Sequence, residues 1–148
     1  MKMSTKGRYG LRAMMDLAAN QKDDVPVFLA DVARREEISE KYLEHIFTAL
    51  RAAGLVRTVR GRKGGFLLSR PPAQITARAI ITALEGPCRL VDCVDKPDVC
   101  PRSATCASRD VWTLLGGKMD EFLSGLTLDQ LARMQEEKSG KGSAMYYI

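Results

Sequence analysis

Long apolar runs are missing from this sequence of 148 residues. A helix that crosses a membrane needs about 20 consecutive apolar residues, and the chain has no uncharged apolar run close to that length. Residues 1–4 lead directly into a charged helical pattern, whereas a secretory signal would continue into an apolar core. We therefore expect a cytoplasmic protein that has no membrane partner and whose cysteines are kept reduced.

Histidine is almost absent as well, since His45 is the only one in the chain. A catalytic nucleophile would find no second histidine to pair with, and the sequence has neither a C-x-x-C pair nor a glycine loop that cradles a phosphate. These absences argue against an enzyme. A thiol enzyme or metal carrier, in which the helices serve only as a scaffold, is kept as the last alternative.

Positive charge is concentrated in the first half of the chain, although the formal net charge of the whole is only +5. Residues 1–70 hold 14 Lys and Arg against 8 Asp and Glu, a net charge of +6, and residues 71–148 hold 9 against 10, or −1. A basic half is typical of nucleic-acid binding, although many soluble proteins are basic without that function.

Hydrophobic periodicity predicts two helices at the start of this basic half. The first covers residues 5–20, with Leu11, Met14, Met15 and Ala18 on its apolar face and Lys6, Arg8, Arg12 and Asp16 elsewhere. The second is short, covers residues 29–36 and buries Leu29, Val32 and Ala33. Both are expected to contribute to one core.

A third helix is predicted from Glu40 to about Ala53, with Ser39 as its N-cap and Gly54 as its stop. Its apolar residues recur at spacings of three and four, which directs Leu43, Ile46, Phe47 and Leu50 inward. The opposite face is polar and consists of Lys41, Glu44, His45, Thr48 and Arg51.

Two β-prone runs, residues 55–59 and 66–68, flank the segment 60–65, which combines three glycines with Arg60, Arg62 and Lys63. This pattern predicts a hairpin with a basic tip. The order of short helix, turn, polar-faced helix and basic hairpin indicates a winged helix-turn-helix, whose helix enters a major groove and whose wing enters the adjacent minor groove. A small α+β domain with a solvated helix face is the alternative.

Within that polar face, Glu44 and His45 differ in what they offer to DNA. A carboxylate is repelled by phosphates and helps binding only where it accepts a hydrogen bond, for example from cytosine N4. We therefore expect Glu44 to select the DNA sequence while lowering the affinity for DNA. His45 can donate to a base or a phosphate, or simply face solvent. Two such units are needed for useful affinity, so we expect a homodimer on half-sites about one helical turn apart.

The second half of the chain predicts a helix over residues 75–85, an irregular stretch over 88–105, a long helix over 104–123 and a short last helix that begins at the capping box of Thr127 and Gln130. The long helix is expected to dimerise, with packing on its own domain as the alternative. We divide the chain into a DNA-binding unit (1–70), a connecting helix (71–86), a cysteine-rich sensor loop (87–105), dimerisation and C-terminal helices (106–138) and a mobile tail (139–148).

Four cysteines lie in this irregular stretch or directly after it, at positions 88, 93, 100 and 106. Zinc sites favour C-x2-C pairs, which are absent, so structural zinc is weakly supported. Thiolates that arrive from an irregular loop suit an iron-sulfur cluster, and buried inert cysteines are the alternative.

Several motifs resemble the Rrf2 family of bacterial transcription regulators, and the similarity covers nearly the whole chain. These motifs are S-T-K-G-R-Y-G-L-R-A-M at 4–14, Y-L-E-H-I-F at 42–47, L-R-A-A-G-L-V-R-T-V-R-G-R-K-G-G-F-L-L at 50–68, the loop with Cys93, Cys100 and Cys106, and L-T-L-D-Q-L at 126–131. The resemblance implies a dimeric winged helix with a long dimerisation helix and, in cluster-binding members, an iron-sulfur cluster whose state sets operator affinity.

By position, the resemblance implies that Lys41, Glu44 and His45 touch bases, that Arg60 enters the minor groove, and that Cys93, Cys100 and Cys106 are cluster ligands. The remaining members of the expected DNA interface are Tyr42, Thr48, Arg51, Arg62, Lys63, Lys6 and Arg8. The fourth ligand departs from the family, because the histidine or acidic residue that members use is replaced here by Arg109 and Arg8. Arginine stays protonated and is not an iron ligand, which leaves Cys88, Asp110, a partner carboxylate or a small molecule.

Together these observations predict a mainly α protein, a homodimeric DNA-binding repressor or dual regulator that senses iron-sulfur or redox status through a cysteine-ligated cluster. We expect a 2Fe-2S cluster in preference to a 4Fe-4S cluster. The alternative keeps the DNA-binding function but uses bare thiols, with disulfide or persulfide formation as the switch.

Overall fold

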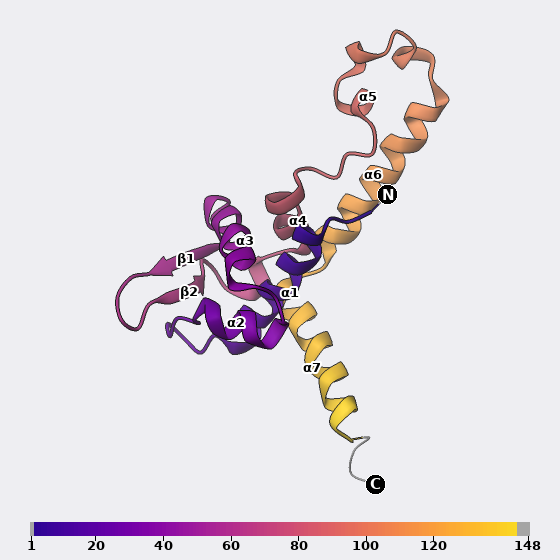
Figure 1. Ribbon diagram of the computed structural model, residues 1–148. Coiled ribbons are helices and arrows are strands. Elements are labelled where there is room, and N and C mark those ends of the chain that lie inside the picture. Colours follow the sequence, from indigo (N-terminus) through magenta and orange to yellow (C-terminus); the bar gives the residue numbers. More distant parts are fainter. Residues whose placement is uncertain (1, 145–148) are drawn as a thin grey trace.

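The structure of the protein, a computed structural model, describes the backbone of residues 2–144 and the side chains of residues 2–140 (Figure 1). It is mainly helical, as expected, with one two-stranded wing. Its elements in chain order are α1 (Thr5–Asn20), α2 (Leu29–Glu36), α3 (Glu40–Ala52), β1 (Val56–Val59), β2 (Gly65–Leu68), η1 (Pro72–Gln74), α4 (Ala77–Glu85), α5 (Asp92–Asp95), η2 (Pro97–Val99), η3 (Ser103–Thr105), α6 (Ala107–Gly125) and α7 (Leu128–Ala144).

The first three helices form around one apolar core. Ser39 caps α3 as expected, since its hydroxyl oxygen accepts the Tyr42 N–H at 3.2 Å. A left-handed residue, Glu37 at φ 54°, makes the tight turn between α2 and α3. The fully buried side chains at the centre include Met14, Leu17, Leu43, Ile46, Phe47 and Leu50. Helix α3 therefore buries the face that the sequence directs inward, which leaves its polar face outside.

Strands β1 and β2 form the antiparallel wing, with Val56 opposite Leu68 and Val59 opposite Gly65. A bridge between Val27 and Phe66 ties the wing to the segment before α2. This approach is close, because a Cβ on Gly65 would lie 2.5 Å from the backbone oxygen of Val27. The wing is thus fixed at its base, and its tip extends away from the core (Figure 1).

Helix α1 occupies the centre of the molecule and packs against α2, α4 and α7. The crossing with α4 is tight at Gly10, where a Cβ would lie 2.1 Å from Leu84 Cδ1. At the end of the same crossing, the Glu85 carboxylate accepts the Gly7 N–H at 3.0 Å and the Ser4 hydroxyl. Ser4 is the N-cap of α1, since its Oγ also accepts the Gly7 N–H at 3.1 Å, and the last residue of α4 reinforces this cap.

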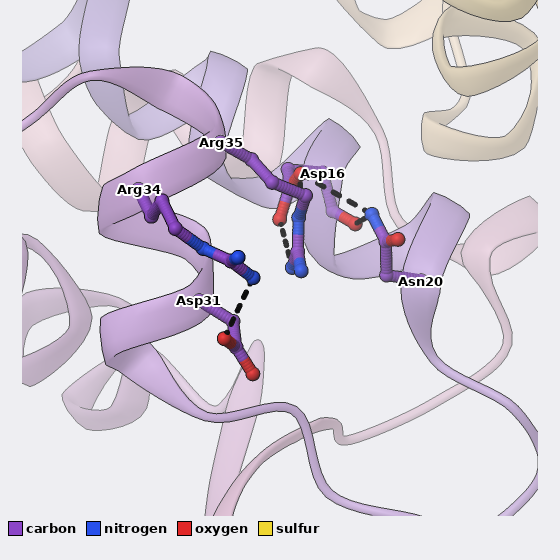
Figure 2. A network of polar contacts seen from close by, with 5 residues as sticks. All are labelled: Asp16, Asn20, Asp31, Arg34 and Arg35. Carbon is purple, nitrogen blue, oxygen red and sulfur yellow. Dashed lines mark hydrogen bonds and ion pairs between the residues drawn. The ribbon is translucent and has the colours of Figure 1, made fainter.

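Asp16, which the sequence places off the apolar face of α1, is nevertheless buried. It is 8% exposed and its carboxylate accepts two hydrogen bonds from Arg35 of α2, each at 2.8 Å (Figure 2). The Asn20 amide donates to it as well. Helix periodicity does not predict this burial, because the partner that makes it possible lies on another helix. This ion pair joins α1 to α2.

Some boundaries in the second half differ from those expected. Helix α4 starts at Ala77 instead of Ile75, because Thr76 is its N-cap and residues 75–77 pair with residues 126–128. Helix α6 starts three residues later than expected because η3 precedes it. Helix α7 is longer than the short helix we expected and continues through residues 139–144 of the expected tail. Residues 145–148 of that tail lie outside the described part of the chain.

Helix α6 projects from the helical body and carries the cysteine loop at its far end (Figure 1). None of its 19 residues, all of which the structure describes, is buried. Large apolar side chains stand exposed along it, including Leu114 (71%), Phe122 (66%) and Val111 (55%). Among the described residues, no helix is both long and apolar enough to cross a membrane.

Candidate nucleic-acid interface and cysteine loop

The outer face of α3 carries the polar side chains that the sequence assigned to it. Lys41, Glu44, His45, Thr48 and Arg51 are all exposed. The Thr48 hydroxyl donates to the backbone oxygen of Glu44 at 2.7 Å, so its oxygen remains available as an acceptor. Arg51 Nη1 reaches Thr58 Oγ1 of the wing at 3.4 Å. This face offers donors, acceptors and both signs of charge, which direct readout of base edges requires.

Tyr42 differs from its neighbours on α3, because it is half-buried and packs edge-on against Tyr9 of α1, with ring centroids 6.0 Å apart and an interplanar angle of 89°. Lys6 is half-buried on α1, and Arg8 is exposed with its guanidinium donating to Thr5 Oγ1 at 3.3 Å. The tyrosine pair fixes the start of α3 against the start of α1. Tyr42 therefore has a packing role besides the one we expected.

The three cationic side chains of the wing tip are exposed to solvent. Arg60, Arg62 and Lys63 are exposed, and within the described part of the chain none of them makes an ion pair. Arg57 at the base of the wing is different, because it pairs with Asp24 at 3.2 Å. Unpaired cations at a glycine-containing tip are available to phosphates or to a minor groove without first breaking a contact.

The cysteine loop is built from three short helical turns, α5, η2 and η3, and is less irregular than its prolines suggested. The Ser103 hydroxyl lies against the Cys100 carbonyl at 2.7 Å and links two of the turns, and Arg89 pairs with Asp95 at the base of the loop. All four cysteines are free thiols and half-buried. The loop therefore has a defined fold of its own.

The thiols are not gathered into one site. Within residues 2–144, no group of three or more His, Cys, Asp or Glu side chains is arranged to hold a metal ion. The donor chemistry suits an iron-sulfur cluster, since thiolates from a loop are its usual ligands. The arrangement of these side chains does not suit one.

Arg109, the residue at the position of the missing fourth ligand, has a clear structural role. Its Nε donates to the Cys93 carbonyl at 2.8 Å and its Nη2 donates to the Val94 carbonyl at 3.1 Å. The guanidinium thus joins the first turn of α6 to the end of α5. Sequence reasoning excluded Arg109 as a ligand but missed this contact; an arginine in the first turn of a helix, where the dipole disfavours a cation, was the available signal.

Glu85 was also missed as a residue that connects parts of the fold. Its partners Ser4 and Gly7 are 81 and 78 residues away in the chain, and nothing local marks a carboxylate at a helix end as the cap of another helix. The contact lies just before Gly86, where the chain leaves α4 toward the cysteine loop. The base of the loop therefore adjoins the start of α1.

Three packed helices, a recognition helix with an exposed polar face and a basic two-stranded wing define a winged helix-turn-helix protein. The family model of Rrf2, described as an iron-dependent transcriptional regulator, matches residues 3–134. The chain therefore belongs to the Rrf2 family. It is a DNA-binding transcriptional regulator and not an enzyme.

Individual relatives agree with this assignment. The chain is 38% identical over 136 residues to the HTH-type transcriptional regulator IscR of Yersinia enterocolitica, a match that covers 92% of this chain and 82% of the relative. Among solved structures, it is similar to CymR, described as the global cysteine regulator of B. subtilis, with a TM-score of 0.75, 38% identity and coverage of 90% and 98%. It is also similar to T. potens IscR, with a TM-score of 0.74, 36% identity and coverage of 93% and 90%.

Proposed function

We propose that the protein is a homodimeric repressor that works on DNA in the bacterial cytoplasm, and that residues 87–105 are its sensor. Residues 1–70 would bind DNA, with α3 in the major groove and the wing in the minor groove. The observation that carries this proposal is the exposed polar face of α3 beside a wing whose tip cations are unpaired. Residues 71–86 would connect this unit to the helices that follow.

The residues of this interface divide into two roles. Lys41, Glu44 and His45 lie on the exposed face of α3 and would meet base edges, where each good pair of hydrogen bonds contributes about 1–3 kcal/mol of discrimination. The remaining polar residues would mainly contact phosphates or the minor groove and supply affinity that falls with salt. They are Thr48, Arg51, Arg60, Arg62, Lys63, Lys6 and Arg8, with Tyr42 at the edge of the interface.

Dimerisation through α6 would complete the DNA-binding surface. The helix exposes Val111, Leu114 and Phe122 and buries none of its residues in its own subunit. A row of exposed apolar side chains is costly in water and is removed from it when a second copy covers the helix. Two recognition helices would then face half-sites about 34–36 Å apart.

Two chemistries are open to the sensor loop. An iron-sulfur cluster on Cys93, Cys100 and Cys106 is supported by the donor set and by the similarity to IscR, and Cys88 is the nearest further thiol. A switch of bare thiols is favoured by the observation that no metal-binding group is assembled among the described residues. Either signal would act by a differential free energy, since about 1.4 kcal/mol changes operator affinity tenfold.

Binding of a fluorescent operator fragment, followed by anisotropy as salt is raised, tests the DNA-binding surface. We expect affinity to fall steeply with salt. Arg60→Ala should weaken binding to all sequences, whereas Glu44→Ala should change the ranking of sequences more than the affinity. Arg57→Ala is the matched control, because Arg57 is already paired with Asp24. Unchanged binding in both Arg60→Ala and Glu44→Ala would contradict the groove assignment.

Anaerobic purification with absorption spectroscopy and iron and sulfide analysis decides between the two sensor chemistries. A coloured protein with bound iron and sulfide supports the cluster. A colourless, iron-free protein after proper reconstitution removes the cluster and leaves the thiol switch. Cys88→Ser then separates a four-thiol site, which would lose its cluster, from a three-thiol site, which would keep it.

A further inference from the structure

Arg109 is hydrogen-bonded to the segments of two cysteines, Cys93 and Cys106. Its side chain donates to the Cys93 carbonyl at 2.8 Å, and its backbone N–H donates to the Cys106 carbonyl at 3.0 Å. It also shares with Cys100 the wall of an open cavity of about 530 Å³. The guanidinium itself therefore holds the Cys93 segment, and the three thiols do not form one group among the described residues.

The contact matches the chemistry of both partners. Carbonyls in the last turn of a helix lack intrahelical donors, and the four-residue helix α5 presents those of Cys93 and Val94. A guanidinium carries its donors in a rigid fork and reaches two carbonyls at once, which an ammonium group does not do with the same geometry. The negative end of α5 also compensates for placing a cation in the first turn of α6, where the dipole disfavours it.

We propose that Arg109 is a positioning residue that holds the cysteine loop on α6 without any metal, in the place where cluster-binding relatives supply a ligand. The proposal rests on the proposed function in one respect, namely that this loop is the sensor. The charge of the guanidinium and its two hydrogen bonds replace the bond to iron that a ligand at this position would make. The loop is consequently ordered before any signal arrives.

This arrangement defines how a signal can act. A metal ion that gathers the thiols of Cys93, Cys100 and Cys106 requires the loop between α5 and the start of α6 to move, because these thiols do not form one group among the described residues. Such movement breaks the two Arg109 hydrogen bonds, because they span these two elements. Arg109 therefore contributes to the free-energy difference between the two states of the loop, and it lies on the helix that carries the exposed apolar face.

Hydrogen exchange of the metal-free, reduced protein, measured by mass spectrometry, tests whether Arg109 holds the loop on α6. Arg109→Ala should speed exchange of the amides in residues 92–106 by about tenfold or more, while residues 5–52 exchange as in the wild type. Arg102→Ala is the matched control, because it removes the same charge from an exposed arginine of the loop for which the described residues provide no side-chain partner. Equal loop exchange in Arg109→Ala and the wild type would overturn the proposal, as would a wild-type loop without protection.

A second substitution separates the effect of the two directed guanidinium hydrogen bonds from the effect of the positive charge. Arg109→Lys keeps the cation but not the two directed bonds, so its loop should exchange like that of Arg109→Ala. Wild-type protection of the loop in Arg109→Lys would mean that charge alone holds the loop, and the proposed role of the two hydrogen bonds would be refuted.

Cobalt(II) titration of the reduced protein, followed by thiolate-to-cobalt absorption, provides a readout that a merely structural role would not move. Arg109→His returns a ligand to the site and should bind cobalt about tenfold more tightly than either the wild type or Arg109→Ala. Equal affinities of Arg109→His and Arg109→Ala would refute the replaced-ligand assignment. Operator binding by the same wild-type sample reports on the proposed function separately, since its failure would leave the exchange results unchanged.

Discussion

Removing Arg35 should destabilise the protein more than removing Asp16, although the two residues form one ion pair (Figure 2). Arg35→Ala leaves behind a carboxylate whose side chain is 6% exposed, and among the described residues only the Asn20 amide then donates to it, at 3.2 Å. Asp16→Ala leaves a guanidinium that is 31% exposed and can turn toward water. The stability lost when the ion pair is broken therefore depends on which charged side chain is left behind.

The structure sets the size of the difference. Removing one partner of a buried pair costs about 3–5 kcal/mol, whereas exposed pairs contribute about 0–1 kcal/mol. Asp16 is close to the first case and Arg35 is intermediate. We expect a loss of about 3 kcal/mol for Arg35→Ala and about 1.5 kcal/mol for Asp16→Ala. In the double variant the loss should be smaller than the sum, because the two residues are in direct contact.

Urea unfolding of the two variants and the wild type measures these values from the shift of the midpoint at a common slope. The hydrogen bond to Asp16 raises the pKa of Arg35, so its contribution is present below the unfolded pKa and is lost only as pH rises through the folded one. Both values lie above the range of the assay, so the loss for Asp16→Ala should be the same at about pH 7 and about pH 9.

Arg34→Ala is the matched control, because Arg34 is the neighbouring arginine of α2 and pairs with Asp31 at 3.0 Å on the surface (Figure 2). Its side chain is 75% exposed, and we expect a change within about 0.5 kcal/mol. The reasoning would be refuted if Arg35→Ala cost no more than Arg34→Ala, or no more than Asp16→Ala.

Three further substitutions test other parts of the structure. Leu114→Glu should turn the proposed dimer into a monomer in sedimentation experiments, because it places a charge on the exposed apolar face of α6. Gly65→Ala should lower the free energy of unfolding by about 2 kcal/mol in urea titrations, because its Cβ would meet the backbone oxygen of Val27 and backbone cannot yield. Thr127→Val should raise the pKa of Asp129 in a carbon NMR titration, since the Thr127 hydroxyl is the main cause of its lowered value. A carboxylate with a lowered pKa stabilises above its unfolded pKa and loses that contribution as pH falls, so this variant should also lose less stability on acidification.

Local signals in the sequence were sufficient for the DNA-binding unit. The Ser39 cap, the buried face of α3 and the glycine-containing wing are each determined within a few residues, and the structure contains all three. The capping box at the start of α7 is also present, with the Thr127 N–H donating to Gln130 Oε1 at 3.0 Å. Periodicity and capping describe such features well because the interactions that create them are short in sequence.

Contacts between distant segments were not predictable in this way. The Asp16 and Arg35 pair joins two helices, Glu85 of α4 reinforces the Ser4 cap of α1, and the Arg109 contact crosses from α6 to α5. Each uses a charged residue that a helical wheel assigns to solvent. The extension of α7 beyond residue 138 was missed for a different reason, because Gly140 and Gly142 argue for a tail on propensity alone.

The absent side chain at Gly10 has a mechanical consequence for signalling. Where two helices meet through interposed side chains, rotamer changes can absorb a displacement of one helix before the other responds. Here the Leu84 side chain of α4 packs directly on the α1 backbone at Gly10, so one helix can move little before the other must move as well. A displacement of the end of α4 should therefore move α1, and the helices α2 and α3 packed on it, as a whole and not as a local rearrangement.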